Sequence, residues 1–143
     1  MQAPSARQFC FYWLPPLLLT GGILAVSGEL GSSQHTKKLL DWLFSWLPFA
    51  ELPQMEESHG YLRKVGHVTV YGSLYWLWFR AFVGRFSRLK PAVCWSLGLC
   101  LLTALADEGH QYLVPSRDGS ILDVALDFGA AAVAALALSF KRI

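Results

Sequence analysis

Charged residues are scarce in this sequence. They make up 15% of its 143 residues, whereas a soluble domain usually has about a quarter. Hydrophobic residues make up 54%, and the formal net charge is only +2. There is no block of like charges, so the composition lacks the electrostatic footprint of a nucleic-acid-binding protein. The sequence therefore predicts a single membrane domain, residues 1–143, with no nucleic acid among its partners.

Cysteine and the common catalytic motifs are also sparse or missing. Cys10, Cys94 and Cys100 show no metal-ligand spacing, and we interpret them as small apolar residues. The chain has no glycine-rich phosphate loop, no Gly-x-Ser-x-Gly turn and no His-Glu-x-x-His helix. The sequence therefore names no reaction, no cofactor and no metal by motif.

Apolar segments, in contrast, are prominent. The first segment, residues 9–26, has two interpretations, a cleaved signal peptide or a first membrane-spanning helix. The embedded Pro15-Pro16 pair and the single preceding arginine favour an uncleaved helix. Each segment is about long enough to cross or nearly cross a bilayer as a helix. We therefore predict an all-α, polytopic membrane protein with about four transmembrane helices, at residues 9–26, 64–83, 92–106 and 121–140.

Residues 27–63 form a mixed connection between the first two predicted spans. Within it, residues 38–49 are too short to span and are rich in leucine and tryptophan. Because tryptophan favours the membrane interface, we expect a short interfacial helix there, with a buried re-entrant segment as the alternative. Lysines and arginines gather at residues 80–90 and at the carboxyl end. By the positive-inside rule, both termini are then cytoplasmic and 27–63 is extracytoplasmic.

Polar side chains occur at the outer ends of three predicted spans. Spacings of i, i+3 and i+7 place them on one face of the second span and one face of the fourth. The polar stripe of the fourth predicted span continues as Ala131 and Ala134, which are small residues that permit close helix contact. Ser120 fits an N-cap, and Asp123 would complete a capping box. We expect one shared binding cluster, made of Lys64, His67, Tyr71, Asp107, Glu108, Gln111, Arg117, Ser120, Asp123 and Asp127.

Carboxylates outnumber cations in this expected cluster. Four of its residues are carboxylates, whereas only Lys64 and Arg117 are dependable cations. Near lipid such an excess must be compensated. Either His67 is protonated, a carboxyl group keeps its proton, or a cation or cationic ligand binds. If the site is catalytic, the candidates are His67 as base and Glu108 as acid or metal ligand.

Two motifs follow one another in the second half of the chain. Lys64-x-x-His67-x-x-x-Tyr71 comes first, and Asp107-Glu108-x-x-Gln111 opens a run that continues as Pro115-x-Arg117-x-x-Ser120-x-x-Asp123-x-x-x-Asp127. This combination, over residues 64–138, resembles the VanZ-like family. These are small bacterial membrane proteins named after the teicoplanin-resistance accessory protein of glycopeptide-resistance clusters.

Three positions depart from the family pattern. The family usually has Asn in place of Asp127 and Gly in place of Ala130, and a Gly often stands where this chain has Ser116. The resemblance implies about four membrane helices, a place in the bacterial inner membrane and a role at the cell envelope. It implies neither a particular reaction nor antibiotic resistance.

The function we hypothesise is binding of an envelope lipid or lipid-linked precursor at the outer-face cluster. Lys64 and Arg117 would meet anionic groups, with Arg suited to phosphate, and the carboxylates would hold an amine or a metal. The alternatives are an intramembrane hydrolase or transferase and a structural or partner-binding helix bundle. Membrane lipids are the expected partners. Because four spans make only a thin bundle, the sequence is also compatible with a homo-oligomer.

Overall fold

The computed structural model describes residues 6–28, 42, 55–86, 88–115 and 119–140. Within these residues every regular element is a helix, and no strand is present. The predicted all-α fold class is confirmed for this part of the chain. The predicted interfacial helix at 38–49 lies outside the described residues, apart from Trp42.

Six helical elements make up the described chain. The first three, α1, η1 and α2, form one continuous helix, in which η1 is a π-helical segment. The elements are α1 (Ala6–Gln8), η1 (Phe9–Trp13), α2 (Leu14–Val26), α4 (Met55–Val83), α5 (Leu89–Leu113) and α6 (Ile121–Phe140).

Helix bounds agree with the predicted spans at some ends and differ at others. α6 coincides with the predicted segment 121–140, whereas α5 extends beyond 92–106 at both ends. α4 begins at Met55, so the end of the segment 27–63 is helical rather than a connection. Its first residues are mostly good helix formers with no proline among them, and helix formation therefore begins well before the apolar stretch.

Three stretches of the described residues are long and apolar enough to cross a membrane, namely Phe9–Val26, Leu89–Leu113 and Ile121–Leu138. α4 is long enough, but it is not among them. It carries Arg63, Lys64 and His67 together with several tyrosines and tryptophans, which are less apolar than aliphatic residues. The apolar helices thus indicate a membrane-embedded protein.

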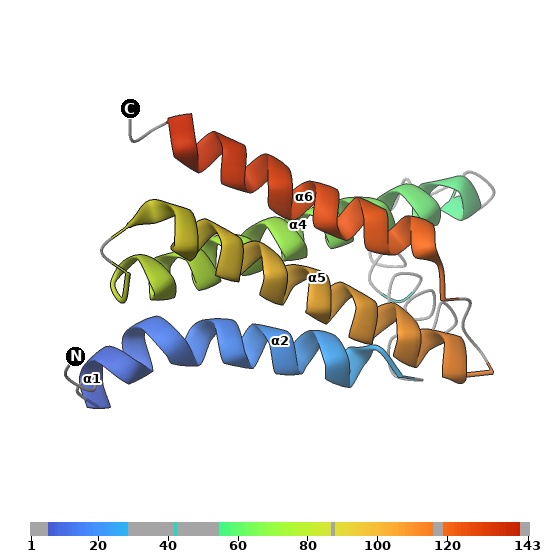
Figure 1. Cartoon of the computed structure of the whole chain (residues 1–143). Helices are drawn as coiled ribbons and strands as arrows, with labels where there is room; N and C mark the ends of the chain where they lie inside the picture. Colours follow the sequence, from blue (N-terminus) through green and yellow to red (C-terminus); the bar gives the residue numbers. More distant parts are fainter. Residues whose placement is uncertain (1–5, 29–41, 43–54, 87, 116–118, 141–143) are drawn as a thin grey trace.

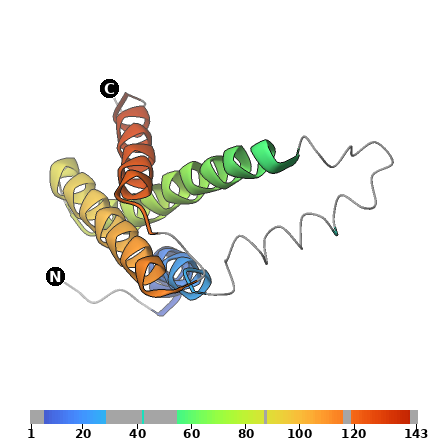
Figure 2. The ribbon, with the colours of Figure 1, turned by 90° about the vertical axis from the view of Figure 1, so that its right-hand side faces the viewer.

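The helices lie side by side in one bundle (Figure 1). α4, α5 and α6 all pack against one another, and α2 packs against α4 and α5 on the side away from α6 (Figure 2). The start of α1 and the end of α6 lie at the same end of the bundle (Figure 1). The other end, where α5 finishes and α6 begins, holds the polar residues.

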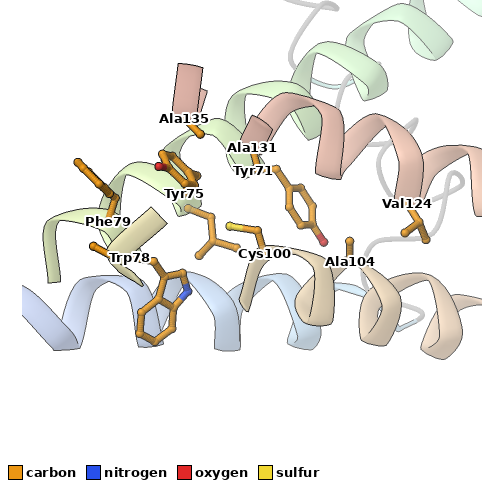
Figure 3. Close-up of a cluster of buried hydrophobic side chains, with 11 residues drawn as sticks. Tyr71, Tyr75, Trp78, Phe79, Cys100, Ala104, Val124, Ala131 and Ala135 are labelled. Atoms are coloured by element: carbon orange, nitrogen blue, oxygen red, sulfur yellow. The ribbon is translucent and has the colours of Figure 1, made fainter. Parts of the chain in front are cut away.

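Large side chains from α4 fill the core between the helices, and small residues from α5 and α6 surround them. Leu74 and Tyr75 of α4 are fully buried, as are Cys100, Ala104 and Ala131. Figure 3 shows Tyr75 with Cys100, Ala104 and Ala131. Small residues let helix backbones approach closely, which is how helices associate where lipid gives no hydrophobic driving force. The stripe predicted on α6 is present, since Ala131 is buried and Ala134 packs partly buried against the core.

Arg80 of α4 attaches the amino-terminal helix to the bundle. Pro15 and Pro16 have no N–H groups, so neither can donate to the carbonyl of Phe11, which lies four and five residues before them. Instead Arg80 Nη2 donates to the Phe11 carbonyl oxygen at 2.6 Å. The guanidinium also lies over the rings of Phe11, Tyr12 and Trp76, at 4.8, 5.4 and 5.1 Å from their centroids. One side chain therefore satisfies the carbonyl that the prolines leave free.

We predict that Arg80→Ala destabilises the bundle by about 1–3 kcal/mol, because it removes a charged hydrogen bond and cation–π contacts. Thermal unfolding in mild detergent, followed by tryptophan fluorescence, measures the loss. The loss should be smaller in a Pro15→Ala background, where residue 15 regains an N–H for the Phe11 carbonyl. Arg88→Ala, at an exposed arginine between α4 and α5, is the control. An equal loss in both backgrounds would contradict this account of Arg80.

Candidate functional site

Four ionisable side chains from three helices meet near the end of the bundle where α5 finishes. They are His67 from α4, Asp107 and Glu108 from α5, and Asp127 from α6. One nitrogen or oxygen from each lies within 4.8 Å of those of the other three. Asp107 and Glu108 are 4% exposed and Asp127 is 0% exposed. We call these four residues the carboxylate–histidine cluster.

His67 and Asp127 form its closest pair. His67 Nδ1 lies 3.0 and 3.1 Å from the two carboxylate oxygens of Asp127, so a hydrogen bond between imidazole and carboxylate joins α4 to α6. The His67 ring is stacked near that of Tyr71, one turn further along α4. Tyr71 is buried, and its hydroxyl donates to Asp107 Oδ2 at 3.4 Å, toward α5 (Figure 3).

Gln111 connects the two carboxylates of α5. Its amide nitrogen donates to Asp107 Oδ1 at 3.0 Å and to Glu108 Oε1 at 3.3 Å, and the side chain is 2% exposed. The amide oxygen accepts from Arg63 Nη2 at 3.5 Å. Both hydrogens of the amide are therefore directed at carboxylates, which fixes the positions of Asp107 and Glu108.

The short connection from α5 to α6 supplies a backbone donor to the cluster. The N–H of Ser120 donates to Glu108 Oε2 at 2.8 Å. Gly119 makes this approach feasible, because a Cβ there would overlap the Glu108 carbonyl oxygen and lie 2.8 Å from the Tyr112 nitrogen. As predicted, Ser120 caps α6, with its Oγ accepting from the Leu122 N–H at 3.2 Å. The capping box differs from the prediction, because the Ser120 N–H is taken by Glu108 instead of Asp123.

Arg63 is the cation of the site that the sequence analysis missed. Its Nη2 lies 3.0 Å from Asp123 Oδ2, with side-chain exposures of 44% and 22%. Arg63 comes four residues before His67, a spacing that places both on one side of α4 and was the available signal. Lys64 is exposed and makes none of the side-chain bonds of the cluster. Arg117 lies outside the described residues.

Ser27, at the end of α2, also reaches the site. It is 2% exposed, and its hydroxyl donates to the backbone carbonyl of Asp107 at 2.8 Å. The contact fixes the end of the amino-terminal helix against α5. No polar stripe or spacing marks Ser27 in the sequence, so sequence analysis offered no signal for it.

Of the ten expected site residues, the structure thus brings eight together. Hydrogen bonds connect Tyr71, Asp107, Glu108, Gln111 and Ser120 and, through Arg63, Asp123. The His67–Asp127 pair has donor atoms within 4.8 Å of those of Asp107 and Glu108. Asp123 and Ser120 lie at the edge of this group, and Lys64 lies outside it. Whether these residues bind a ligand remains a prediction.

A cavity of about 330 Å³ lies beside the cluster, between α2, α4 and α5. One wall is apolar and comes from α2, with Leu19, Ile23 and Val26. The lining from α4 and α5 includes Val70 and the polar side chains of Arg63, His67, Tyr71, Asp107 and Gln111. Two glycines, Gly22 and Gly66, also line it, and a Cβ at either would meet no neighbouring atom within 4 Å. The cavity therefore offers both kinds of surface to one molecule.

The electrostatic balance of the site is uneven. Three buried carboxylates face one another, and among the described residues His67 is the only ionisable base in contact with any of them. The guanidinium of Arg63 lies at the rim, on Asp123 and Gln111. Buried carboxylates without a counter-charge are strongly disfavoured. The arrangement is therefore suited to holding a proton, a cation or a cationic group.

Comparison with known proteins identifies a family to which the chain is similar. The VanZ/LLP1 family model matches residues 9–142, which is nearly the whole chain. The match extends beyond the resemblance over residues 64–138 and includes the amino-terminal helix. Comparisons with curated proteins and with solved structures give no significant match. The whole-length match to the family model, together with the apolar helices, establishes the chain as a membrane protein of the VanZ/LLP1 family.

Proposed function

We propose that the protein binds an envelope lipid or lipid-linked precursor in the cavity between α2, α4 and α5. The observation that carries the proposal is that one cavity is lined by apolar side chains together with a few polar ones. Ligand sites combine a mainly apolar lining with a few polar groups that orient the ligand. A lipid has the same two parts, because its hydrocarbon chain and its head group differ in polarity.

Arg63 is the group that would receive an anionic head. Its guanidinium lies at the cavity, is 44% exposed and carries several N–H donors. Guanidinium groups bind phosphate with two parallel hydrogen bonds, which a lysine ammonium does not do. Its ion pair with Asp123 is half-exposed and contributes about 0–1 kcal/mol, so a phosphate can compete for the same donors. Arg63 would thus meet the anionic group, a role that the sequence analysis gave to Lys64 and Arg117.

The hydrocarbon part would lie along α2. Leu19, Ile23 and Val26 face the cavity, and Gly22 beside them adds no bulk. The outer side of the amino-terminal helix is exposed and apolar, with Phe11, Leu17 and Leu18 among its residues. A lipid in the surrounding bilayer would therefore meet a continuous apolar surface on its way to the cavity.

The proposal includes a topology. α4 has 29 residues, about 44 Å of helix, which exceeds the roughly 30 Å of a bilayer core, and we take it as the fourth span. The bundle starts and ends on one side (Figure 1). The same side holds the connection from α4 to α5, with Arg85 and Arg88, and the start of α5, with Lys90. We place the protein in the inner membrane of a bacterium, with that side of the bundle in the cytoplasm. The site then faces the cell envelope.

A second candidate function is an intramembrane hydrolase or transferase. The observation that favours it is the His67–Asp127 pair, because a carboxylate that holds an imidazole is the usual arrangement of a general base. Glu108 lies within reach of the same space and would serve as acid. The lipid of the first proposal would then be the substrate.

We predict that filling the cavity abolishes lipid occupancy. In lipid nanodiscs, a phospholipid with a photoreactive acyl chain should label the wild-type peptide that contains Leu19 and Ile23. Gly22→Leu should reduce that labelling severalfold, because its side chain enters the cavity. Gly98→Leu, on an exposed face of α5 with no neighbour within 4 Å, should leave it unchanged. Equal labelling of both variants, with both still folded, would refute the lipid site.

For the second candidate, we predict turnover of a radiolabelled membrane lipid that His67→Gln removes. The thermal midpoint of this variant should stay within a few degrees of wild type, since Gln retains a hydrogen bond to Asp127. Wild-type protein that releases no product, or a variant that is as active as wild type, would exclude catalysis by His67. Loss of folding in every cluster variant, with neither binding nor turnover in wild type, would favour the structural bundle.

A further inference from the structure

We infer that His67, Asp107, Glu108 and Asp127 form a binding site for one divalent transition-metal ion. The inference concerns the site of the proposed function, and only the role given to the metal at the end of this section rests on that function. Metal binding itself needs no lipid. It is carried by the spacing of four donor side chains, by their burial and by their charge.

The spacing fits a metal ion. Metal bonds to carboxylate oxygen or imidazole nitrogen are about 2.0–2.2 Å long, so adjacent donors of an octahedral ion lie about 2.8–3.1 Å apart and opposite donors about 4.0–4.4 Å apart. In the cluster, His67 Nδ1 and Asp127 Oδ1 are 3.0 Å apart, and all four donors lie within 4.8 Å of one another. Shifts of a few tenths of an ångström would bring them to bonding distance.

The donors also come from separate elements that are held in place. His67 belongs to α4, Asp107 and Glu108 to α5, and Asp127 to α6. The side chain of Gln111 and the N–H of Ser120 donate to the carboxylates of α5. Metal ligands are commonly oriented by such outer hydrogen bonds, which fix the geometry before the ion arrives.

The charge of the cluster calls for a cation of more than one unit. Three carboxylates that are at most 4% exposed face a single imidazole. A protonated His67 would neutralise one of them, whereas a divalent ion next to a neutral imidazole neutralises two. The only other cation that reaches the site among the described residues is Arg63, and it bonds to Asp123 and Gln111 instead. The described side chains therefore leave a net negative charge on the cluster, which a divalent ion would largely neutralise.

The donor types select the kind of ion. Carboxylate oxygens suit Mg²⁺, Ca²⁺ and Mn²⁺, whereas imidazole suits Zn²⁺, Fe²⁺ and other transition metals. One imidazole with three carboxylates favours an ion that accepts both, such as Mn²⁺, Fe²⁺ or Zn²⁺. The cavity of about 330 Å³ is lined by His67 and Asp107, so water and ions can reach the cluster from it.

Mn²⁺ titration of the purified full-length protein tests the inference. We expect one Mn²⁺ per chain by electron paramagnetic resonance, with spin-echo modulation from the ¹⁴N of one histidine. Asp127→Asn, which keeps the size of the side chain, should weaken binding by roughly tenfold or more. His67→Gln should remove the ¹⁴N signal. Mg²⁺ at a hundredfold excess should not displace the ion, because it does not favour imidazole.

His110→Gln is the control. It changes an exposed histidine of α5 that is not among the four donors. It should bind Mn²⁺ as wild type does and keep the ¹⁴N signal. Absence of binding in wild type, binding without a ¹⁴N signal, or equal losses in His110→Gln and His67→Gln would each overturn the inference. Thermal unfolding without metal shows whether Asp127→Asn is folded, and wild-type binding with its ¹⁴N signal tests the site even if that variant is not.

The proposed function gives this metal a role. An ion at the cluster would present a positive charge toward the cavity beside Arg63, so a phosphate head could bridge the metal and the guanidinium. Photolabelling by phospholipid should then rise severalfold when Mn²⁺ is added to metal-free protein. Stoichiometric Mn²⁺ binding with unchanged labelling would leave the metal site standing and would remove the bridging role. Labelling without any Mn²⁺ binding would remove the metal site and leave the lipid site.

Discussion

The structure depends on one electrostatic constraint, which is that three carboxylates are buried where α4, α5 and α6 meet. Asp107, Glu108 and Asp127 are each at most 4% exposed, and carboxylates at such positions need partners that balance their charge and satisfy their oxygens. The neighbouring side chains are arranged accordingly. Gln111 spans the two acids of α5, and His67 joins Asp127 from α4. These bonds supply hydrogens but little positive charge, and the remaining negative charge is what a ligand would meet.

The rest of the fold holds these side chains together near one end of the bundle. Ala131 and the other small residues of the core bring α6 close to α4 and α5. Gly119 lets the α5–α6 connection cross the end of α5, so that the Ser120 N–H reaches Glu108. At the opposite end, Arg80 anchors the amino-terminal helix through the carbonyl that the prolines leave free. α2 is thereby positioned to provide the apolar wall of the cavity beside the cluster.

Much of this arrangement could be predicted from the sequence, because membrane helices and their polar stripes follow simple periodicities. The all-α class, the family and the meeting of His67 with the carboxylates of α5 and α6 were all predictable. Side-chain choices between close neighbours were not. Arg63, rather than Lys64, turns toward the site, and the Ser120 N–H bonds to Glu108 rather than to Asp123. Both outcomes depend on how neighbouring helices pack, which spacing along one helix does not contain.

We propose that a species that is not part of the chain completes the carboxylate–histidine cluster. Native mass spectrometry of protein gently extracted from its own membrane tests this for wild type and for Glu108→Gln. We predict that wild type carries a bound metal ion, lipid or lipid-linked precursor and that Glu108→Gln, with one charge fewer in the cluster, loses it. A wild-type protein with no bound species, indistinguishable from the variant, would contradict the account and would leave the cluster as a structural junction between helices.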